Sequence, residues 1–566
     1  RGKFMKKRFF ALLLVISMVL LMFSGCGKKD QADSGDTKKT TSDKSADKDT
    51  GDKKETGSSD TSDSSTASKY QTTYGSKMFD NVKIKVQLFD RSNAPEGSTI
   101  TENRWTEYAK EQMKKVGIEL EFVPVPRWDE IPKMQSMMAS QTAPDITLTY
   151  TMSHVEQYFK DGGVWDLSEF IDGPDQALNM KAYLGEDVIN IGRTSKDELY
   201  GIVAKRATTA KSNLFLRKDW MDKLNLEVPT TPDELYDVIY KMKYENPDAR
   251  NTTLGAIVWN AWNLKAAFSE LVGDPKEVAI SLGDDAFGDY YDPGNREYYR
   301  FMNKLYNAGL LNQEYYTMAE DDFKGYVVTG DVAFFEGSVN FAVDVLRGSL
   351  LKTLQENVPG ADIVSIPPLK NVNDGKQYSA AYAAAGIMSF CPLTASEEVV
   401  EACMTYLDWM CTEEGGFVFY HGFEGEHYEF DENGTPKVLD ATYNAQDKDW
   451  IRTDIFLVGN QGYFMTVDDF NACTSLEAPG YEQHVVDNYE NALTGIIISD
   501  QTYTSPSTPD LITDIGIVRD EYTVSVVTCP ESAFDATYDE YMKELEAVGI
   551  KTIIEERTAH FNEMYN

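Results

Sequence analysis

The chain has 566 residues, a formal net charge of −38 and six cysteines. Because a domain usually takes about 100–200 residues, this length predicts several domains or lobes. The 54 basic and 92 acidic side chains argue against a nucleic-acid-binding protein, since an acidic surface repels the phosphate backbone, and the cysteines are too few for a disulfide-dense scaffold. The five histidines form no recognisable zinc-binding spacing, and we expect neither a metal nor a cofactor.

The first 26 residues have the order of a secretory signal. A basic cluster, Met5–Arg8, precedes the apolar run Phe9–Phe23 and the small pair Ser24-Gly25 before Cys26. A helix over that run spans about 22 Å, less than the ~30 Å hydrocarbon core, which favours a signal peptide over a permanent membrane span. The small pair resembles a bacterial lipobox, although Phe23 stands where that pattern usually has Leu. We predict a lipoprotein signal peptide over 1–26 with Cys26 lipidated, for example by palmitate; the alternative is an ordinary signal with an incidental cysteine.

Residues 27–75 are predicted to form a disordered tether. Positions 27–69 contain no aromatic residue and no aliphatic residue larger than alanine. Such a segment lacks the apolar area that would offset its chain entropy. A lipid at Cys26 followed by a flexible spacer is typical of a protein anchored on the extracellular face of a cell membrane, and we expect a Gram-positive bacterium. A periplasmic lipoprotein is the alternative.

Strand and helix patterns alternate in the body that follows. Strands are predicted over 82–89, 118–123 and 145–150, with helices over 104–116 and 131–140 between them. This βαβαβ order is typical of an α/β fold with a mainly parallel sheet and helices on both of its faces.

Two later segments carry clear helix starts. In Thr231-Pro232-Asp233-Glu234, threonine is the expected N-cap, proline occupies the first turn, and the glutamate is expected to close a capping box. A second helix is predicted to begin after Thr394, with Cys403 on its apolar face as a buried free thiol. The acidic run 284–292 is interpreted as a solvated loop, with calcium binding as the alternative.

Several segments occur in the order typical of one protein family. Together they resemble the extracellular solute-binding proteins of carbohydrate ABC importers (family 1, the maltose-binding-protein superfamily), in particular the larger lipoproteins of Gram-positive bacteria. The segments are Pro144-Asp145-Ile146, Gly162–Leu167, Leu199–Ile202, Leu216–Trp220, Lys223–Glu234, Gly330–Gly337 and Phe423–Tyr428. Residues 245–250 lack the alternating oxygen ligands of the calcium loop found in many relatives, so we carry over no calcium site.

This resemblance implies a two-lobe periplasmic-binding-protein-like fold of type II. Each lobe would be a mainly parallel sheet flanked by helices, with a hinge between the lobes and the ligand bound in the cleft. The expected division places lobe I over 76–208, lobe II over 209–378, a return to lobe I over 379–430, and a C-terminal part, mostly lobe II with helices, over 431–566. The chain would cross near 204–211, near 379–386 and again after 428.

Sugar recognition needs aromatic rings for the flat C–H faces and forked hydrogen-bonding groups for the hydroxyls. Trp259 and Trp262 follow a predicted strand at the place where the family has cleft aromatics, and the alternative is one apolar helix face in the core. Glu336 follows a buried-looking strand, so it is either a hydroxyl acceptor or a helix N-terminal cap.

Further ligand-binding candidates lie at strand ends and in one loop motif, and each has a structural alternative. Tyr150 alternatively caps the sheet, Arg206 alternatively forms an interlobe ion pair, and Glu424 with His427 alternatively forms a loop-stabilising pair. The remaining candidates are Asp90, Arg91 and Tyr382.

We interpret the chain as the substrate-binding receptor of an ABC importer and not as an enzyme. It would capture a neutral saccharide, an oligosaccharide rather than a monosaccharide, and deliver it to the permease subunits, acting as a monomer. Neutral sugars are favoured because the acidic body repels anions. The alternatives are a receptor of the same fold for peptides or other non-sugars, or a surface glycoside hydrolase, although no hydrolase motif occurs.

Overall fold

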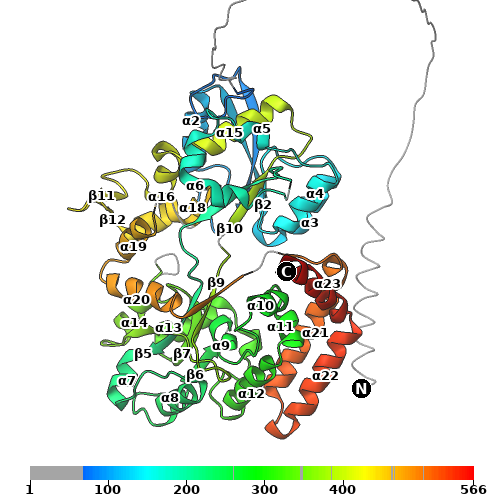
Figure 1. Cartoon of the computed structure of the whole chain (residues 1–566). Coiled ribbons are helices and arrows are strands. Elements are labelled where there is room, and N and C mark those ends of the chain that lie inside the picture. The colour runs from blue at the N-terminus through cyan, green and yellow to red at the C-terminus, as the bar shows by residue number, and fades with distance from the viewer. Residues whose placement is uncertain are drawn as a thin grey trace, which may run out of the picture. The chain divides into compact units, whose positions relative to one another are not determined.

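The computed structural model describes residues 68–565 except 195, 259–260, 345–348, 384, 461–462, 464–465 and 501–502. The predicted signal peptide, the lipidated Cys26 and the tether up to residue 67 lie outside the described residues. Two lobes, each with its own hydrophobic core, make up the described part (Figure 1). We call residues 68–206 and 385–475 lobe I, and residues 212–381 and 478–565 lobe II. Nowhere in this described part is there a helix with the length and apolar character that crossing a membrane requires.

The folded body begins earlier than the sequence suggests. Tyr70 is buried and stacks on Phe170, with 4.0 Å between ring centroids, and the Thr72 hydroxyl donates to the Phe170 carbonyl at 2.7 Å. Residues 70–75 therefore do not belong to the tether, because the ring at position 70 supplies the apolar area that residues 27–69 lack.

Lobe I is built around parallel and antiparallel strands. Strand β1 (Val82–Asp90) pairs in parallel with β2 (Ile118–Pro126), and a four-stranded sheet has the order β13-β4-β10-β3. Its strands are β3 (Thr147–Thr149), β4 (Ile202–Arg206), β10 (Ala385–Phe390) and β13 (Gly459–Asn460), and a hairpin is formed by β11 (Tyr428–Phe430) and β12 (Pro436–Val438). The helices are α2 (Arg104–Lys114), α3 (Glu130–Ala139), α4 (Met152–Lys160), α5 (Ser168–Ile171), α6 (Leu178–Asn190), α15 (Glu397–Met410), α16 (Val418–His421), α17 (Ala441–Asn444), α18 (Trp450–Ile455) and α19 (Val467–Ser475).

Helix α15 forms the centre of the lobe I core. It is the helix predicted to begin after Thr394, and Cys403 on it is a fully buried free thiol, as expected. The core also contains Trp450–Val458, which the sequence division assigned mostly to lobe II. The chain therefore stays in lobe I well beyond residue 430, because the apolar side chains of α18 pack against that core.

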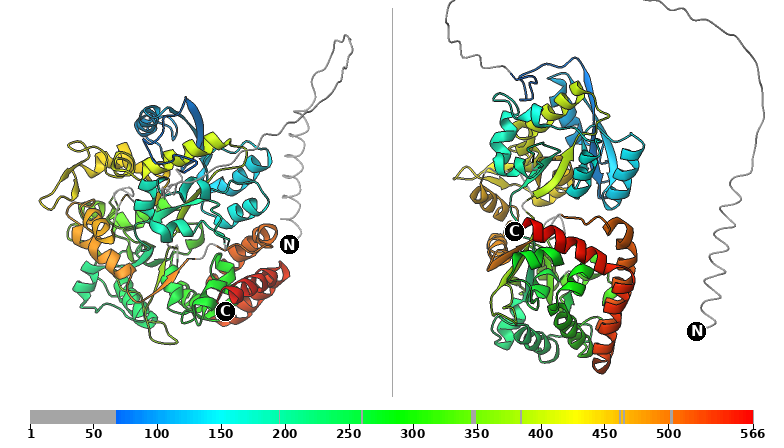
Figure 2. Two further views of the ribbon diagram at one scale, coloured as in Figure 1. Left: turned by 45° about the horizontal axis from the view of Figure 1, so that its top comes forward. Right: turned by 45° about the vertical axis from the view of Figure 1, so that its right-hand side comes forward.

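Lobe II has a four-stranded sheet of order β6-β7-β5-β8 and a separate pair, β14-β9. Its strands are β5 (Ser212–Arg217), β6 (Leu254–Val258), β7 (Val332–Ser338), β8 (Ile363–Ile366), β9 (Tyr378–Ala381) and β14 (Ile496–Ser499). The helices are α7 (Lys218–Leu224), α8 (Pro232–Tyr244), α9 (Trp262–Ala266), α10 (Pro275–Ser281), α11 (Asp285–Tyr291), α12 (Gly294–Asn307), α13 (Glu320–Thr329), α14 (Leu350–Asn357), α20 (Glu482–Ala492), α21 (Thr508–Thr528), α22 (Phe534–Ala547) and α23 (Ile550–Met564). Helices α21, α22 and α23, in orange to red, pack together along one side of the lobe (Figure 2).

The predicted start of α8 is confirmed, with one difference. The Thr231 side chain accepts the Glu234 N–H at 3.3 Å, and Pro232 occupies the first turn. The Glu234 carboxylate, however, accepts the N–H and the hydroxyl of Thr230 rather than the N–H of the cap itself. The helix start is thus secured one residue upstream of the expected capping box.

The two-lobe α/β fold is confirmed, but the four-stranded sheets are mixed rather than mainly parallel. In lobe I, β10 runs antiparallel to both β3 and β4, and in lobe II, β5 runs antiparallel to both β7 and β8. Both β5 and β10 are the first strands after a crossing between the lobes. A strand that enters a lobe from the hinge runs opposite to one that leads toward it, which reverses the local pairing.

The crossings connect the lobes at the level of the cleft. The first runs through 207–211, the second begins at Tyr382 after β9, and another lies between α19 and α20; the first two follow the predicted positions. These two segments are joined to each other, since Ala210 forms a β-bridge with Ala381 and the Tyr382 N–H donates to Thr209 O at 2.9 Å.

Candidate functional site

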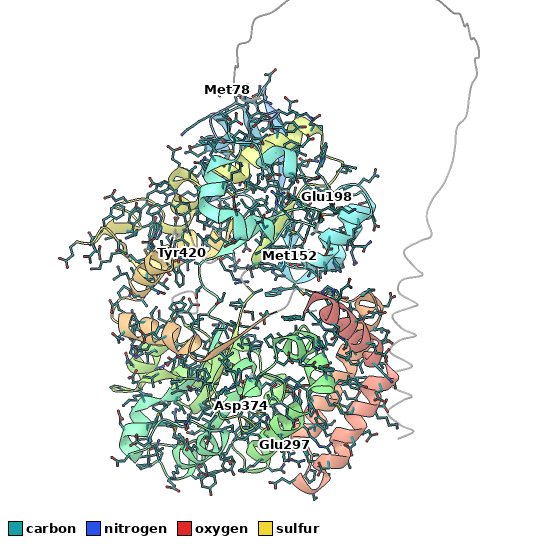
Figure 3. The ribbon with its side chains drawn as sticks, in the orientation of Figure 1. Met78, Met152, Glu198, Glu297, Asp374 and Tyr420 are labelled. Carbon is teal, nitrogen blue, oxygen red and sulfur yellow. The ribbon has the colours of Figure 1, made fainter. Side chains whose placement is uncertain are left out.

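Cavities open between the two lobes beside the crossing segments. The larger has a volume of about 910 Å³ and combines lobe I residues such as Arg91 and Asp454 with lobe II residues such as Asn340. A second cavity, of about 360 Å³, combines Tyr150 and Arg206 with residues of the C-terminal helices. Tyr382 lines both. Figure 3 shows Met152 and Tyr420 on the side of lobe I that faces lobe II, whereas Glu297 and Asp374 lie in the body of lobe II.

Three of the predicted ligand-binding residues meet in the smaller cavity. Tyr150 follows β3, Arg206 ends β4, and Tyr382 follows β9, so strand ends place all of them at the cleft. The Arg206 guanidinium lies 4.3 Å from the centroid of the Tyr382 ring, and its Nε donates to the Ala385 carbonyl at 3.3 Å. Burial raises the pKa of Tyr150 and lowers the pKa of Arg206, in the latter case against the opposing effect of nearby Tyr382. The cluster is therefore a desolvated cation against one aromatic ring, with a second ring in the lining of the same cavity.

Trp262 lies beside a lysine at the crossing. Lys211 Nζ is 4.5 Å from the Trp262 ring centroid and forms an ion pair with Asp500 at 2.7 Å. Trp262 is the first residue of α9 and lines a smaller adjoining cavity of about 180 Å³. Trp259, the other predicted stacking residue, lies outside the described residues.

Asp90 ends strand β1 and Arg91 follows it, and the two side chains differ in their surroundings. Arg91 lines the larger cavity, where its Nε donates to Asp454 at 2.8 Å. Burial acts to lower the pKa of Arg91, but Asp454 and Tyr150 outweigh it and raise that pKa above its ordinary value. The Asp90 carboxylate accepts the Ser92 N–H at 2.8 Å, which is a local turn contact.

The remaining predicted residues lie away from these cavities. Glu336 is fully buried on β7, where its carboxylate accepts the N–H groups of Asn263 and Leu264 at 2.7 and 3.2 Å at the start of α9. Its contacts thus match the helix-cap alternative. Glu424 is exposed, and its backbone bridges to Tyr428.

His427 is fully buried in lobe I. Its Nδ1 accepts the Phe423 N–H at 3.1 Å, and its Nε2 lies 3.0 Å from Asp447 Oδ2. These contacts stabilise the loop between α16 and β11. His427 therefore has a loop-stabilising contact, but its partner is Asp447 rather than the expected Glu424.

Sequence reasoning missed several charged residues of the larger cavity. Arg452 Nη1 lies 3.2 Å from Asp449 and 3.3 Å from Glu477, and Tyr420 donates to Glu477 at 2.7 Å. Tyr420 comes from α16, Asp449 from the segment before α18, Arg452 from α18 and Glu477 from the turn after α19. No spacing in the sequence indicates that they converge, and the sequence division placed most of them in the other lobe.

The acidic run 284–292 is a helix rather than a solvated loop. Asp284 caps α11 by accepting the Ala286 N–H at 2.9 Å, and Asp289 is buried and pairs with Lys265 at 3.2 Å. Within the described residues, no group of three or more His, Cys, Asp or Glu side chains is arranged to hold a metal ion.

Comparison with known proteins decides the family. Residues 107–417, more than half of the chain, match the family of bacterial extracellular solute-binding proteins. The chain belongs to this family. The resemblance inferred from the ordered segments is therefore confirmed.

Two curated relatives of this solute-binding protein share 23% of the aligned residues with it. The polygalacturonan/rhamnogalacturonan-binding protein YtcQ of Bacillus subtilis is 23% identical over 357 residues, which are 61% of this chain and 67% of YtcQ. Lipoprotein LipO of the same organism is 23% identical over 329 residues, 56% of this chain and 62% of LipO. The chain thus aligns with about two thirds of each relative's length.

Solved structures share the fold. An extracellular solute-binding protein from Bifidobacterium longum subsp. infantis superposes with a TM-score of 0.59 at 16% identity, covering 85% of this chain and 98% of that one. The N-glycan transport solute-binding protein NgtS of Streptococcus pneumoniae superposes with a TM-score of 0.55 at 16% identity, with the same coverages. At these identities the likeness establishes the two-lobe fold.

Proposed function

We propose that this solute-binding protein is the extracellular receptor of an ABC importer that captures an oligosaccharide between its lobes and passes it, uncleaved, to the permease subunits. We further propose that it is a monomer held at the outer face of a Gram-positive membrane by a lipid on Cys26. Family membership supports binding of a solute outside the cell. The names of YtcQ and NgtS refer to polysaccharides and N-glycans, which supports a saccharide as that solute.

One observation carries the proposal. The interlobe cavities, of about 910 and 360 Å³, lie within the size range of ligand sites and share Tyr382 at the crossing. Aromatic rings and forked polar groups from both lobes line the same space, which is the combination that sugar faces and hydroxyl pairs require. A ligand that contacts both lobes binds the closed arrangement more tightly and so favours closure.

Replacing Tyr382 by alanine is expected to weaken oligosaccharide binding about 30-fold. The ring lines both cavities and holds the Arg206 guanidinium, so its loss removes about 2 kcal/mol, the size of an interface hot spot. Calorimetric titration of the full chain with an oligosaccharide panel measures the change. Tyr240→Ala is the matched control, because Tyr240 is 41% exposed on α8.

Mass spectrometry of the recovered sugar completes this test. An intact oligosaccharide whose affinity falls only in Tyr382→Ala supports the proposal. Recovery of a shortened sugar would show a hydrolase instead, and binding of peptides without saccharides would overturn the ligand class.

A further inference from the structure

The charged residues that line the smaller interlobe cavity differ in how they are paired. Its charged lining residues are Arg206, Asp284, Asp500 and Arg557. Both aspartates already have cationic partners outside this set: Asp284 pairs with Arg519, and Asp500 pairs with Lys211 at 2.7 Å. The two arginines are paired differently, and this difference determines which ligand charge the cavity can accept.

Neither arginine has a carboxylate partner among the residues that the structure describes. The Arg206 contacts are the Ala385 carbonyl and the face of the Tyr382 ring. Arg557 donates to the carbonyls of Ala279 and Ile280 at 2.7 Å and of Tyr503 at 3.0 Å. Carbonyl dipoles and ring faces offset a guanidinium charge only in part.

The two arginines differ in how many of their guanidinium nitrogens remain available for a ligand. Arg557 is 1% exposed and is fixed by three backbone carbonyls, so it contributes charge from behind the wall of the cavity. Arg206 is half-buried and uses only its Nε for a hydrogen bond, which leaves both terminal nitrogens available for a ligand. A guanidinium presents two parallel N–H donors at the spacing of a carboxylate.

We infer that this cavity binds a carboxylate carried by the saccharide, with Arg206 as its bidentate partner. The inference rests on the proposed function and narrows it to acidic oligosaccharides, that is, those containing uronate units. Tyr150 and Tyr382, which line the same cavity, would contact the faces of the sugar ring that carries the carboxylate.

The net charge of the chain does not oppose this assignment. The value of −38 predicts a neutral ligand when it is treated as one uniform charge. At physiological ionic strength, however, exposed charges are screened beyond about 8 Å, so the groups that line the cavity dominate the field inside it. Since both aspartates of the lining are already paired, the terminal nitrogens of Arg206 are the charged groups that this cavity leaves for a ligand.

The first step of the test identifies the sugar class. The full chain is incubated with equal amounts of oligosaccharides from acidic polysaccharides (polygalacturonate, alginate, glucuronoxylan), neutral ones (galactan, xylan, starch) and sulfated ones (carrageenan), and the bound fraction is read by mass spectrometry. We expect capture from the carboxylated set. Preferential capture from the neutral or the sulfated set would overturn the carboxylate assignment while leaving the saccharide receptor intact.

The second step tests the role of the carboxylate without changing the protein. The captured oligosaccharide is compared by calorimetry with its methyl ester, which keeps the ring and removes the charge. A charge-assisted hydrogen-bonded pair predicts that the ester binds about 10- to 100-fold more weakly. Equal affinities for acid and ester would overturn the inference.

The third step assigns the binding partner. Arg206→Gln is expected to weaken binding of the acid to the level of the ester and to leave the affinity for the ester unchanged, whereas Arg206→Lys retains part of the preference. Arg300→Gln, a change of a half-buried arginine on α12 outside the cavity lining, is the control. An equal loss for acid and ester in Arg206→Gln would contradict the assignment. If no saccharide of any set binds the unaltered chain, the proposed function itself fails.

Discussion

Glu336→Ala is expected to lower the free energy of unfolding by about 3 kcal/mol and to leave saccharide affinity unchanged in the folded protein. The substitution removes the acceptor for the buried N–H groups of Asn263 and Leu264 and for the Ser212 hydroxyl. A buried donor left without an acceptor costs about 1–3 kcal/mol, and a lost helix cap costs a similar amount. Denaturant titration measures the first quantity and calorimetry with the captured oligosaccharide the second. Loss of ligand affinity at unchanged stability would restore Glu336 as a ligand-binding residue.

The pH dependence of this effect has a definite sign. Burial raises the pKa of Glu336 to about 8, against the opposing hydrogen bonds, while an unfolded glutamate titrates near 4.5. The folded state therefore holds the proton more tightly, and the stability that this group contributes is complete below pH 4.5 and lost as the pH rises through about 8. Glu336→Gln keeps one acceptor and cannot ionise. Its stability relative to the unaltered chain should therefore increase between pH 5 and pH 8, and a constant difference would contradict the burial argument.

Asp408→Ala is the second substitution from which we expect a large loss, about 3–5 kcal/mol of unfolding free energy. Asp408 lies on α15 with no exposed surface, and its carboxylate accepts the N–H groups of Tyr74 and Met180 at 2.8 and 2.9 Å and the Asn179 side-chain amide at 2.7 Å. The change leaves buried donors unsatisfied on two segments at once. It should therefore loosen the first residues of the folded body together with the start of α6.

Hydrogen exchange at Tyr74 and Met180 provides the local measurement for Asp408→Ala, beside the global denaturant titration. Both amides should exchange faster in the variant. Glu398→Ala, an exposed change on the same helix, should stay within about 0.5 kcal/mol of the unaltered chain. A variant with unchanged stability and unchanged exchange at both amides would show that these hydrogen bonds contribute little.

Local signals in the sequence predicted much of the fold. The Thr231-Pro232 start and the apolar positions after Thr394 correspond to α8 and α15, because caps and helical periodicity act within one turn of the chain. The assignment of Trp450–Val458 failed because a short apolar helix carries no information about which of two cores it joins. The prediction of mainly parallel sheets failed for a similar reason. The first strand after each of the first two crossings, β5 and β10, pairs antiparallel with its neighbours, and nothing in its own sequence indicates this.

The candidate site was predicted best where strand ends define it. Tyr150, Arg206 and Tyr382 each adjoin a recognisable strand and converge in one cavity. Asp500 and Arg452 were missed because they come from segments whose place at the cleft depends on tertiary packing alone. Glu336 was predicted by the same strand-end logic as these three residues, yet its side chain turns toward a helix start inside lobe II.

The joined crossing segments determine how many independent motions the two lobes can make. Residues 207–211 and Ala381–Ala383 are held side by side by the Ala210–Ala381 bridge and the Tyr382–Thr209 hydrogen bond, so they are expected to move together. The further connection between α19 and α20 adds another tie between the lobes. We therefore expect closure around a ligand to be mainly a rotation about these tied segments. One distance, for instance between labels at the exposed positions Leu393 and Tyr244, should then follow the binding transition.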